Sequence, residues 1–294
     1  MAAIVLAVLT AMSNAVSNVL QRRVDARLPD RLALSPRLFA RVLQEPVWLT
    51  GIGLVMVSFV LQAWALHLGQ LAVVQPIIIL ELPLTLLFGA RVFHARVGWR
   101  GWAATGLLTA GVGAVLAGLA PRPSAGAHPT SAGWLLGVSV NLAVIAAVAA
   151  AGRHLRGDRR AALWGVAAGL CFGLTATLTK EATSFLASGI GAFLSTWSTW
   201  AMAAMGLTAL LFAQSALQAG RLVSAQPGMS LIDPLVAICW GVAGFGERVQ
   251  QGPGLVLAAG GAAAVAVGVI ELARSPVLRP RSADPSSEGK SDAN

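Results

Sequence analysis

Charged residues are scarce in this chain of 294 residues, of which only 11% are Asp, Glu, Lys or Arg. Soluble globular domains carry roughly 25% charged residues. Hydrophobic residues make up 56% of the chain, and long apolar stretches recur along it. A helix of about 20 apolar residues is long enough to cross the hydrocarbon core of a bilayer. The shortage of charge therefore excludes a soluble protein and predicts an all-α, polytopic membrane protein.

The signatures of catalysis and of cofactor binding are also missing. Cys171 and Cys239 lie far apart inside apolar stretches, so neither a disulfide framework nor a CxxC metal site is expected. The four histidines lack metal-ligand spacing, and no glycine-rich phosphate loop is present. No nucleophile lies beside a base in the pattern that covalent catalysis needs. We therefore expect no enzyme, no catalytic residues, no cofactor and no ATP-driven transport by this chain alone.

Nine apolar segments have the length of membrane spans, at 3–21, 47–66, 71–90, 99–119, 132–151, 161–179, 195–217, 222–243 and 252–272. Segment 31–44 has an apolar side, but its three arginines exclude a span, and an amphipathic helix lying in the membrane interface is expected there. The polar, Pro/Ser-rich tail is expected to be disordered. Tryptophans at span ends are expected to anchor the helices in the interface. These are Trp48, Trp99, Trp102, Trp134 and Trp164.

Basic residues collect on one side of the expected membrane. With the N-terminus outside, only Arg122, Lys180 and Arg248 fall beyond the inward-facing segments, which leaves 18 of the 21 Lys and Arg residues inside. The positive-inside rule therefore predicts a multi-pass plasma membrane protein with an external N-terminus and a cytoplasmic C-terminus. The net charge of +9 follows from this topology. The lipid bilayer is the expected partner, and nucleic acid is not.

Two pairs of segments repeat within the chain. "ALHLGQLAVVQP" at 65–76 matches "ALQAGRLVSAQP" at 216–227 in six of twelve positions, and the same offset brings Pro83 onto Pro234. "AMSNAVSNVLQRRVDA" at 11–26 lies over "GLCFGLTATLTKEATS" at 169–184. Spans 1–4 thus resemble spans 6–9, with span 5 as a spacer. Because five crossings separate equivalent spans, the halves run in opposite directions and form an inverted repeat.

The repeat divides the chain into four parts. The first half covers residues 1–119, the spacer with span 5 covers 120–160, and the second half covers 161–272. Residues 273–294 form the cytoplasmic tail. Glycines in spans 4 and 9 are expected to form close-packing faces, and the same spacing would also serve a homodimer. They are Gly106, Gly111, Gly113, Gly118, Gly254, Gly260, Gly261 and Gly268.

An acid stands beside a proline in the middle of a span in each half. Glu81 lies between Pro76 and Pro83, and Asp233 directly precedes Pro234. A carboxylate at the bilayer centre costs roughly 3 kcal/mol, and each proline removes a backbone donor. In inverted-repeat transporters, substrates bind near the midplane where interrupted helices meet. The predicted pathway residues are Glu81, Asp233, Gln75, Gln226, Asn14 and Asn18, and the predicted helix breaks are at Pro76, Pro83, Pro227 and Pro234.

Two other interpretations of these residues stay open at this point. The prolines would serve only as kinks if the acids paired with neighbouring side chains. Asp233 would cap a half-helix if the eighth span were interrupted at Pro234.

In three sequence features the chain resembles the drug/metabolite transporter superfamily. They are "SNVLQRR" closing the first span, "FGLTATLTKEA" in the sixth, and the paired "AL…G.L…QP" segments. Within that superfamily of EamA-like permeases, the chain is most similar to the NIPA-type magnesium transporter branch and its bacterial relatives. The resemblance implies a secondary carrier that moves a small polar solute or metabolite by alternating access, coupled to protons or another ion.

Two alternatives accompany this expectation. One is a divalent-cation transporter in which Glu81 and Asp233 contribute ligands to Mg²⁺, which binds hard oxygen donors and keeps several waters. The other is a membrane scaffold that transports nothing. A scaffold has no use for acids placed beside matched prolines at the middle of two spans.

Overall fold

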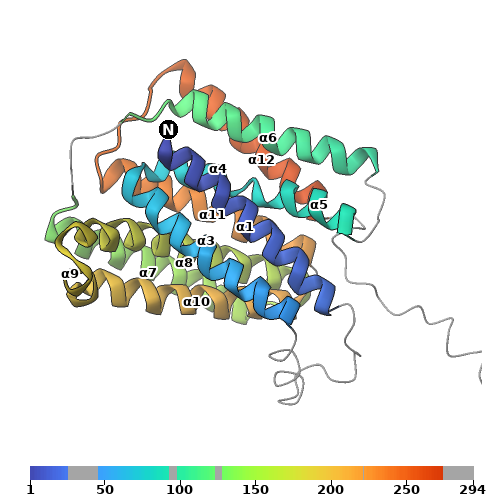
Figure 1. The fold of residues 1–294 in the computed structure, drawn as a ribbon, viewed down its shortest axis with the longest axis horizontal. Helices are drawn as coiled ribbons and strands as arrows, with labels where there is room; N and C mark the ends of the chain where they lie inside the picture. Colours follow the sequence, from blue (N-terminus) through green and yellow to red (C-terminus); the bar gives the residue numbers. More distant parts are fainter. Residues whose placement is uncertain (26–45, 93–97, 123–127, 221, 274–294) are drawn as a thin grey trace, which may run out of the picture.

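The computed structural model describes residues 1–25, 46–92, 98–122, 128–220 and 222–273, and it is a bundle of long helices (Figure 1). Across these residues the only extended pairing is one isolated bridge between Arg122 and Arg248. The predicted all-α fold is therefore confirmed. The interfacial helix expected at 31–44 and the tail from residue 274 lie outside the described residues.

The helices follow the predicted spans closely. They are α1 (Ala2–Asp25), α3 (Pro46–Leu68), α4 (Leu71–Ile78), α5 (Glu81–Val92), α6 (Trp99–Leu119), α7 (Ser131–Arg153), α8 (Gly157–Ser184), the 3-10 helix η2 (Phe185–Ser188), α9 (Ile190–Ser195), α10 (Trp197–Ala219), α11 (Leu222–Ala243) and α12 (Pro253–Ala273). Eight stretches of the described chain are long and apolar enough to cross a membrane, with α4 and α5 together forming one of them. The protein is thus a multi-pass membrane protein. The remaining predicted span, 222–243, is the helix α11, which contains two prolines.

Successive spans begin at opposite ends of the bundle (Figure 1). Ala3 at the start of α1 lies beside Gly69 before α4, and Gly118 near the end of α6 meets Gly254 at the start of α12. We call this end the N-side, and the other end, where α12 finishes, the C-side. On the C-side, Gly220 after α10 lies against Asp158 near the start of α8.

Glycines bring α6 and α12 into backbone contact. A Cβ atom added to Gly118 would lie 2.5 Å from the Gly254 carbonyl oxygen, and one added to Gly111 would lie 2.8 Å from the Gly261 carbonyl oxygen. Gly268 likewise has Leu108 close by. The expected close-packing face is therefore confirmed for these glycines. The other three glycines have no atom of the described residues within 4 Å of an added Cβ: Gly106, Gly113 and Gly260.

The span at 71–92 is broken between α4 and α5. Leu80 donates to the Ile77 carbonyl at 3.0 Å and Leu82 to the Ile79 carbonyl at 3.1 Å, so the chain tightens into three-residue turns there. Pro83 has no N–H to give to Ile79, and a proline ring crowds the carbonyl four residues earlier. The break therefore comes at the position that Pro83 disturbs, whereas Pro76 lies inside α4.

The structure differs from expectation in the second half, because α11 continues through both Pro227 and Pro234. Its backbone lies directly against a row of glycines on α8. A Cβ added to Gly169 would lie 2.6 Å from the Gly228 carbonyl oxygen, and one added to Gly173 would lie 2.7 Å from the Asp233 carbonyl oxygen. Such close contact allows Cα–H groups to face carbonyls along the helix pair. We attribute the continuity of α11 to this support.

Candidate functional site

Three polar side chains from three helices lie near one another inside the bundle. Glu81 is the first residue of α5, and its side chain hydrogen-bonds to the side chain of Asn14 on α1. Asp233 on α11 lies close enough to Glu81 for their charges to interact. We call Asn14, Glu81 and Asp233 the carboxylate cluster. The cluster joins the broken span of the first half to the proline-containing helix of the second.

The carboxylate cluster lies about halfway along each helix that contributes to it. Glu81 is near the middle of the 22-residue stretch Leu71–Val92, and Asp233 is near the middle of the 22 residues of α11. Asn14 is near the middle of the 24 residues of α1. At 1.5 Å of rise per residue, about ten residues place the cluster roughly 15 Å from either end of the bundle. That depth corresponds to the centre of a hydrocarbon core.

The described residues provide hydrogen-bond partners for only some of the oxygen atoms of the two carboxyl groups. Asn14 satisfies one hydrogen bond of Glu81, but Asp233 Oδ1 is shielded from solvent and has no hydrogen-bond partner in the described part of the chain. Two carboxylates close together in a low-dielectric interior repel each other, and a shared proton or a bound cation removes that repulsion. The arrangement is therefore suited to taking up and releasing a positive charge.

The other predicted pathway residues lie away from this contact. Gln75 on α4 is buried, and its Nε2 atom has no partner among the described residues. Gln226 on α11 donates to Ser230 Oγ at 3.0 Å, one turn further along its own helix. Asn18 is exposed on α1, one turn from Asn14. Asp233 does not cap a half-helix, because α11 is helical on both sides of it.

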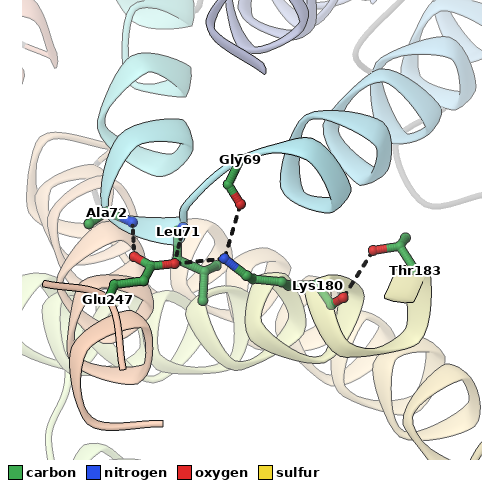
Figure 2. A network of polar contacts seen from close by, with 6 residues as sticks. All are labelled: Gly69, Leu71, Ala72, Lys180, Thr183 and Glu247. Carbon is green, nitrogen blue, oxygen red and sulfur yellow. Dashed lines mark hydrogen bonds and ion pairs between the residues drawn. The ribbon is translucent and has the colours of Figure 1, made fainter. Parts of the chain in front are cut away.

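A second polar site lies on the N-side, and the sequence analysis did not find it. Glu247, in the loop between α11 and α12, accepts hydrogen bonds from the backbone N–H groups of Leu71 at 2.8 Å and Ala72 at 3.0 Å. Lys180, near the end of α8, donates to Glu247 Oε1 at 2.7 Å and to the Gly69 carbonyl oxygen at 3.0 Å. We call these five residues the N-side network (Figure 2).

A group of aromatic side chains adjoins the N-side network through Phe245. The Phe245 ring centroid lies 5.1 Å from Lys180 Nζ, and the Trp134 ring packs against Trp240 with centroids 5.0 Å apart. Trp134 is only 8% exposed, so its expected role as an interface anchor is wrong, whereas Trp99 is 76% exposed as that role requires. An indole can serve the core as well as the interface, because most of its surface is apolar.

Oxygen donors, rather than a preformed metal cage, characterise the interior. Within the described ranges, no group of three or more His, Cys, Asp or Glu residues is placed to hold a metal ion. The carboxylate cluster offers two carboxyl groups and one amide, a donor set that suits a partly hydrated Mg²⁺ or a proton.

Comparison with known proteins gives one informative match. A Corynebacterium glutamicum protein described as uncharacterized is 29% identical to this chain over 251 residues, which cover 84% of this chain and 86% of that protein. No family model matches the sequence, and no solved structure matches it. Because the alignment spans most of both proteins, the similarity concerns the helical bundle as a whole.

Proposed function

We propose that this protein is a secondary transporter of the drug/metabolite transporter type, which moves a small polar solute through the plasma membrane by alternating access. The observation that carries the proposal is that Glu81 hydrogen-bonds to Asn14 and interacts electrostatically with Asp233, with the three residues on three helices halfway along the bundle. Glu81 and Asp233 are proposed to couple transport to a proton or another cation.

The energetic cost of the carboxylate cluster argues for a function. A charged side chain at the centre of a membrane helix costs roughly 3 kcal/mol, and intramembrane acids in transporters mark ion and proton pathways. A scaffold would gain nothing from two such acids, one of which keeps a buried oxygen that has no partner within the described ranges. A carrier gains a site that can be charged and neutralised in turn.

Helix packing supports the proposed inverted repeat. In the first half α1 packs on α3 and also on α4 and α5, and in the second half α8 packs on α10 and on α11. The equivalent spans α6 and α12 pack on each other, as do α4 and α11. We therefore propose halves at 1–119 and 161–272 with a spacer at 120–160, the N-terminus outside and the C-terminus in the cytoplasm.

The mechanism follows from competition at the carboxylate cluster. When solute is absent, a proton or cation neutralises the repulsion between Glu81 and Asp233. A polar solute that hydrogen-bonds to Asn14 and to the carboxyl groups changes the affinity of the cluster for that proton or cation. Access alternates between the two ends as the helices around the cluster move.

Magnesium is the second candidate cargo, and one observation favours it. Glu81 and Asp233, with an amide beside them, provide hard oxygen donors, and Mg²⁺ commonly binds one or two carboxylates while keeping several waters. Glu81 and Asp233 would then contribute carboxylate ligands to the transported ion.

Reconstitution into liposomes tests both candidates. Vesicles that enclose a pH-sensitive dye would receive a panel of amino acids, organic cations and sugars, and vesicles that enclose a magnesium-sensitive dye would receive MgCl₂. We expect proton movement that depends on one solute class, and its loss in Glu81→Gln. Glu271→Gln is the matched control, because Glu271 lies on α12 outside the carboxylate cluster. Magnesium entry without solute-dependent proton movement would select the second candidate. Equal transport by Glu81→Gln and the unaltered protein would refute the proposed site.

A further inference from the structure

Three segments that are distant in sequence meet at the N-side network. Glu247 precedes α12, Gly69 and Leu71 lie at the junction of α3 and α4, and Lys180 lies in the last turns of α8 (Figure 2). The side chain of Glu247 is almost completely buried, and that of Lys180 is 17% exposed. The ion pair thus ties a loop and a helix of the second half to the start of α4 in the first half.

The start of α4 depends on Glu247 for its cap. The residue before α4 is Gln70, whose side chain makes no capping hydrogen bond. Instead, the two carboxylate oxygens of Glu247 accept from the first two N–H groups of the helix. A helix N-terminus carries partial positive charge and is stabilised by a nearby anion. Because α4 has only eight residues, this distant cap fixes its position against α8 and α11.

A layer of packed apolar side chains lies between the N-side network and the carboxylate cluster. Leu71, Val74 and Ile77 on α4 are buried in one hydrophobic cluster with Leu178 on α8 and Trp240 on α11. Val74 is completely buried, and it lies seven residues, or about two turns, before Glu81. The route from the carboxylate cluster to the N-side is therefore filled in this structure.

We infer that the N-side network is a gate, closed in this structure, whose ion pair and helix cap must separate to connect the carboxylate cluster with the N-side. The inference rests on the proposed transport function, since alternating access requires each end of the pathway to open in turn. Opening moves α4 away from α8 and Glu247, and water then solvates both charges. A buried ion pair suits a two-state element, because its attraction and its desolvation cost nearly balance.

The test measures whether water-soluble reagent reaches the layer beneath the network. Val74→Cys is introduced into protein in which Cys171 and Cys239 are replaced by alanine, so that it provides the single thiol. In nanodiscs, a charged methanethiosulfonate should modify this thiol slowly in the otherwise unaltered protein. With Glu247→Gln or Lys180→Gln added, we expect the rate to rise at least tenfold. Lys180→Arg keeps the charge and is expected to keep the thiol protected.

A second reporter separates gating from general loosening. Val269→Cys on α12 is equally buried but belongs to a different hydrophobic cluster, so it should stay protected in every gate variant. The gate is refuted if Glu247→Gln and Lys180→Gln fold, as judged by size-exclusion profile and thermal melt, while the Val74→Cys thiol stays protected. If Glu247→Gln does not fold, Lys180→Gln alone decides. The gate is also refuted if the Val74→Cys and Val269→Cys thiols both become reactive in the gate variants.

The outcome is distinguishable from a failure of the transport proposal. Glu81→Gln should reduce transport in liposomes by about tenfold or more, while the Val74→Cys thiol keeps its slow rate of modification. If the gate variants raise the modification rate of the Val74→Cys thiol tenfold but the protein transports nothing, the proposed transport function is rejected and the proposed opening of the N-side network is retained. Normal transport with a protected thiol in both gate variants would reject the gate and retain the transporter.

Discussion

The two spans that carry matched pairs of prolines have different structures. In the first half, Pro76 and Pro83 occur in a span that is interrupted between α4 and α5. In the second half, Pro227 and Pro234 have the same spacing, yet α11 is one helix from Leu222 to Ala243. The same local sequence signal thus gives a break in one half and none in the other, so something outside the span decides the result.

The helix that packs against each span accounts for the difference. In the register that aligns 11–26 with 169–184, the glycine row of α8 at positions 165, 169 and 173 corresponds to Ala7, Ala11 and Ala15 of α1. The alanines are all fully buried. A methyl group occupies each of these positions in α1, whereas glycine lets the backbone of α11 come into direct contact with α8. Prolines therefore permit a break, and the packing surface decides whether it occurs.

The same register explains why the two acids have different surroundings. Asn14 on α1 corresponds to Phe172 on α8. Glu81 therefore has an amide partner from the helix beside it, whereas Phe172 offers no polar group and Asp233 Oδ1 has no hydrogen-bond partner among the described residues. Both spans thus carry an acid, but only Glu81 has an amide side chain of the neighbouring helix to orient it.

Filling the glycine row of α8 should have the largest effect. Gly169→Leu would place side-chain atoms where the Gly228 carbonyl lies, since an added Cβ is already only 2.6 Å from that oxygen. Overpacking of this kind costs about 3 kcal/mol or more when backbone must move. We expect a large fall in thermal stability, measured by size-exclusion fluorescence after heating. Gly106→Leu on α6 is the control, because no atom lies within 4 Å of its added Cβ. Equal melting temperatures for the two variants would contradict our account of α11.

Neutralising the acids should have the next largest effect, and the two halves should differ. Glu81→Gln removes the acid that Asn14 orients, and we expect transport to fall by about tenfold or more, equivalent to about 1.4 kcal/mol. Asp233→Asn removes an acid with an unpartnered oxygen and should cost less. The two variants are compared by their initial transport rates in liposomes from pH 5.5 to 8.5. A larger loss in Asp233→Asn would place the main coupling group in the second half.

Removing the amide partner should have a smaller effect. Asn14→Ala deletes the hydrogen bond to Glu81, and one such bond is worth about 1 kcal/mol, or roughly fivefold in rate if it acts in coupling. Asn18→Ala, one turn away at an exposed position, should change transport less. The same liposome assay measures both. If Asn18→Ala proves the more damaging, the polar face of α1 contacts the solute directly and Asn14 is secondary.

The helical architecture could be predicted because it depends on local composition. Every predicted span contains a helix within a few residues of the expected bounds, and α8 is longer mainly because its polar ends were left out of the apolar segment. Asn14, Glu81 and Asp233 are predicted pathway residues because polar side chains within spans avoid lipid. The hydrogen bond between Glu81 and Asn14 could not be predicted, because the sequence does not show which helices are neighbours.

The N-side network could not be predicted from the same signals. Glu247 lies in a short polar loop after a span, where an acid needs no explanation, and its partner Lys180 is 67 residues away. Its other partners are backbone N–H groups, which leave no trace in a sequence. The glycine row of α8 is visible as a spacing of four, but its effect on α11 depends on which helix packs there. Long-range packing, rather than local pattern, decides both features.

Restoring a backbone donor at each second proline should have the smallest effect, and it tests the comparison most directly. In Pro234→Ala the new N–H lies within a continuous helix, so it should add one hydrogen bond and stabilise the protein by about 1 kcal/mol. In Pro83→Ala the new N–H faces the Ile79 carbonyl, which already accepts from Leu82 at 3.1 Å, so the gain should be close to zero. Pro253→Ala is the control, because a proline at the first position of a helix replaces no helical hydrogen bond. Melting temperatures in detergent should therefore rise for Pro234→Ala and stay nearly constant for the other two. A larger rise for Pro83→Ala would mean that Pro83 itself causes the break between α4 and α5, whatever helix packs beside it.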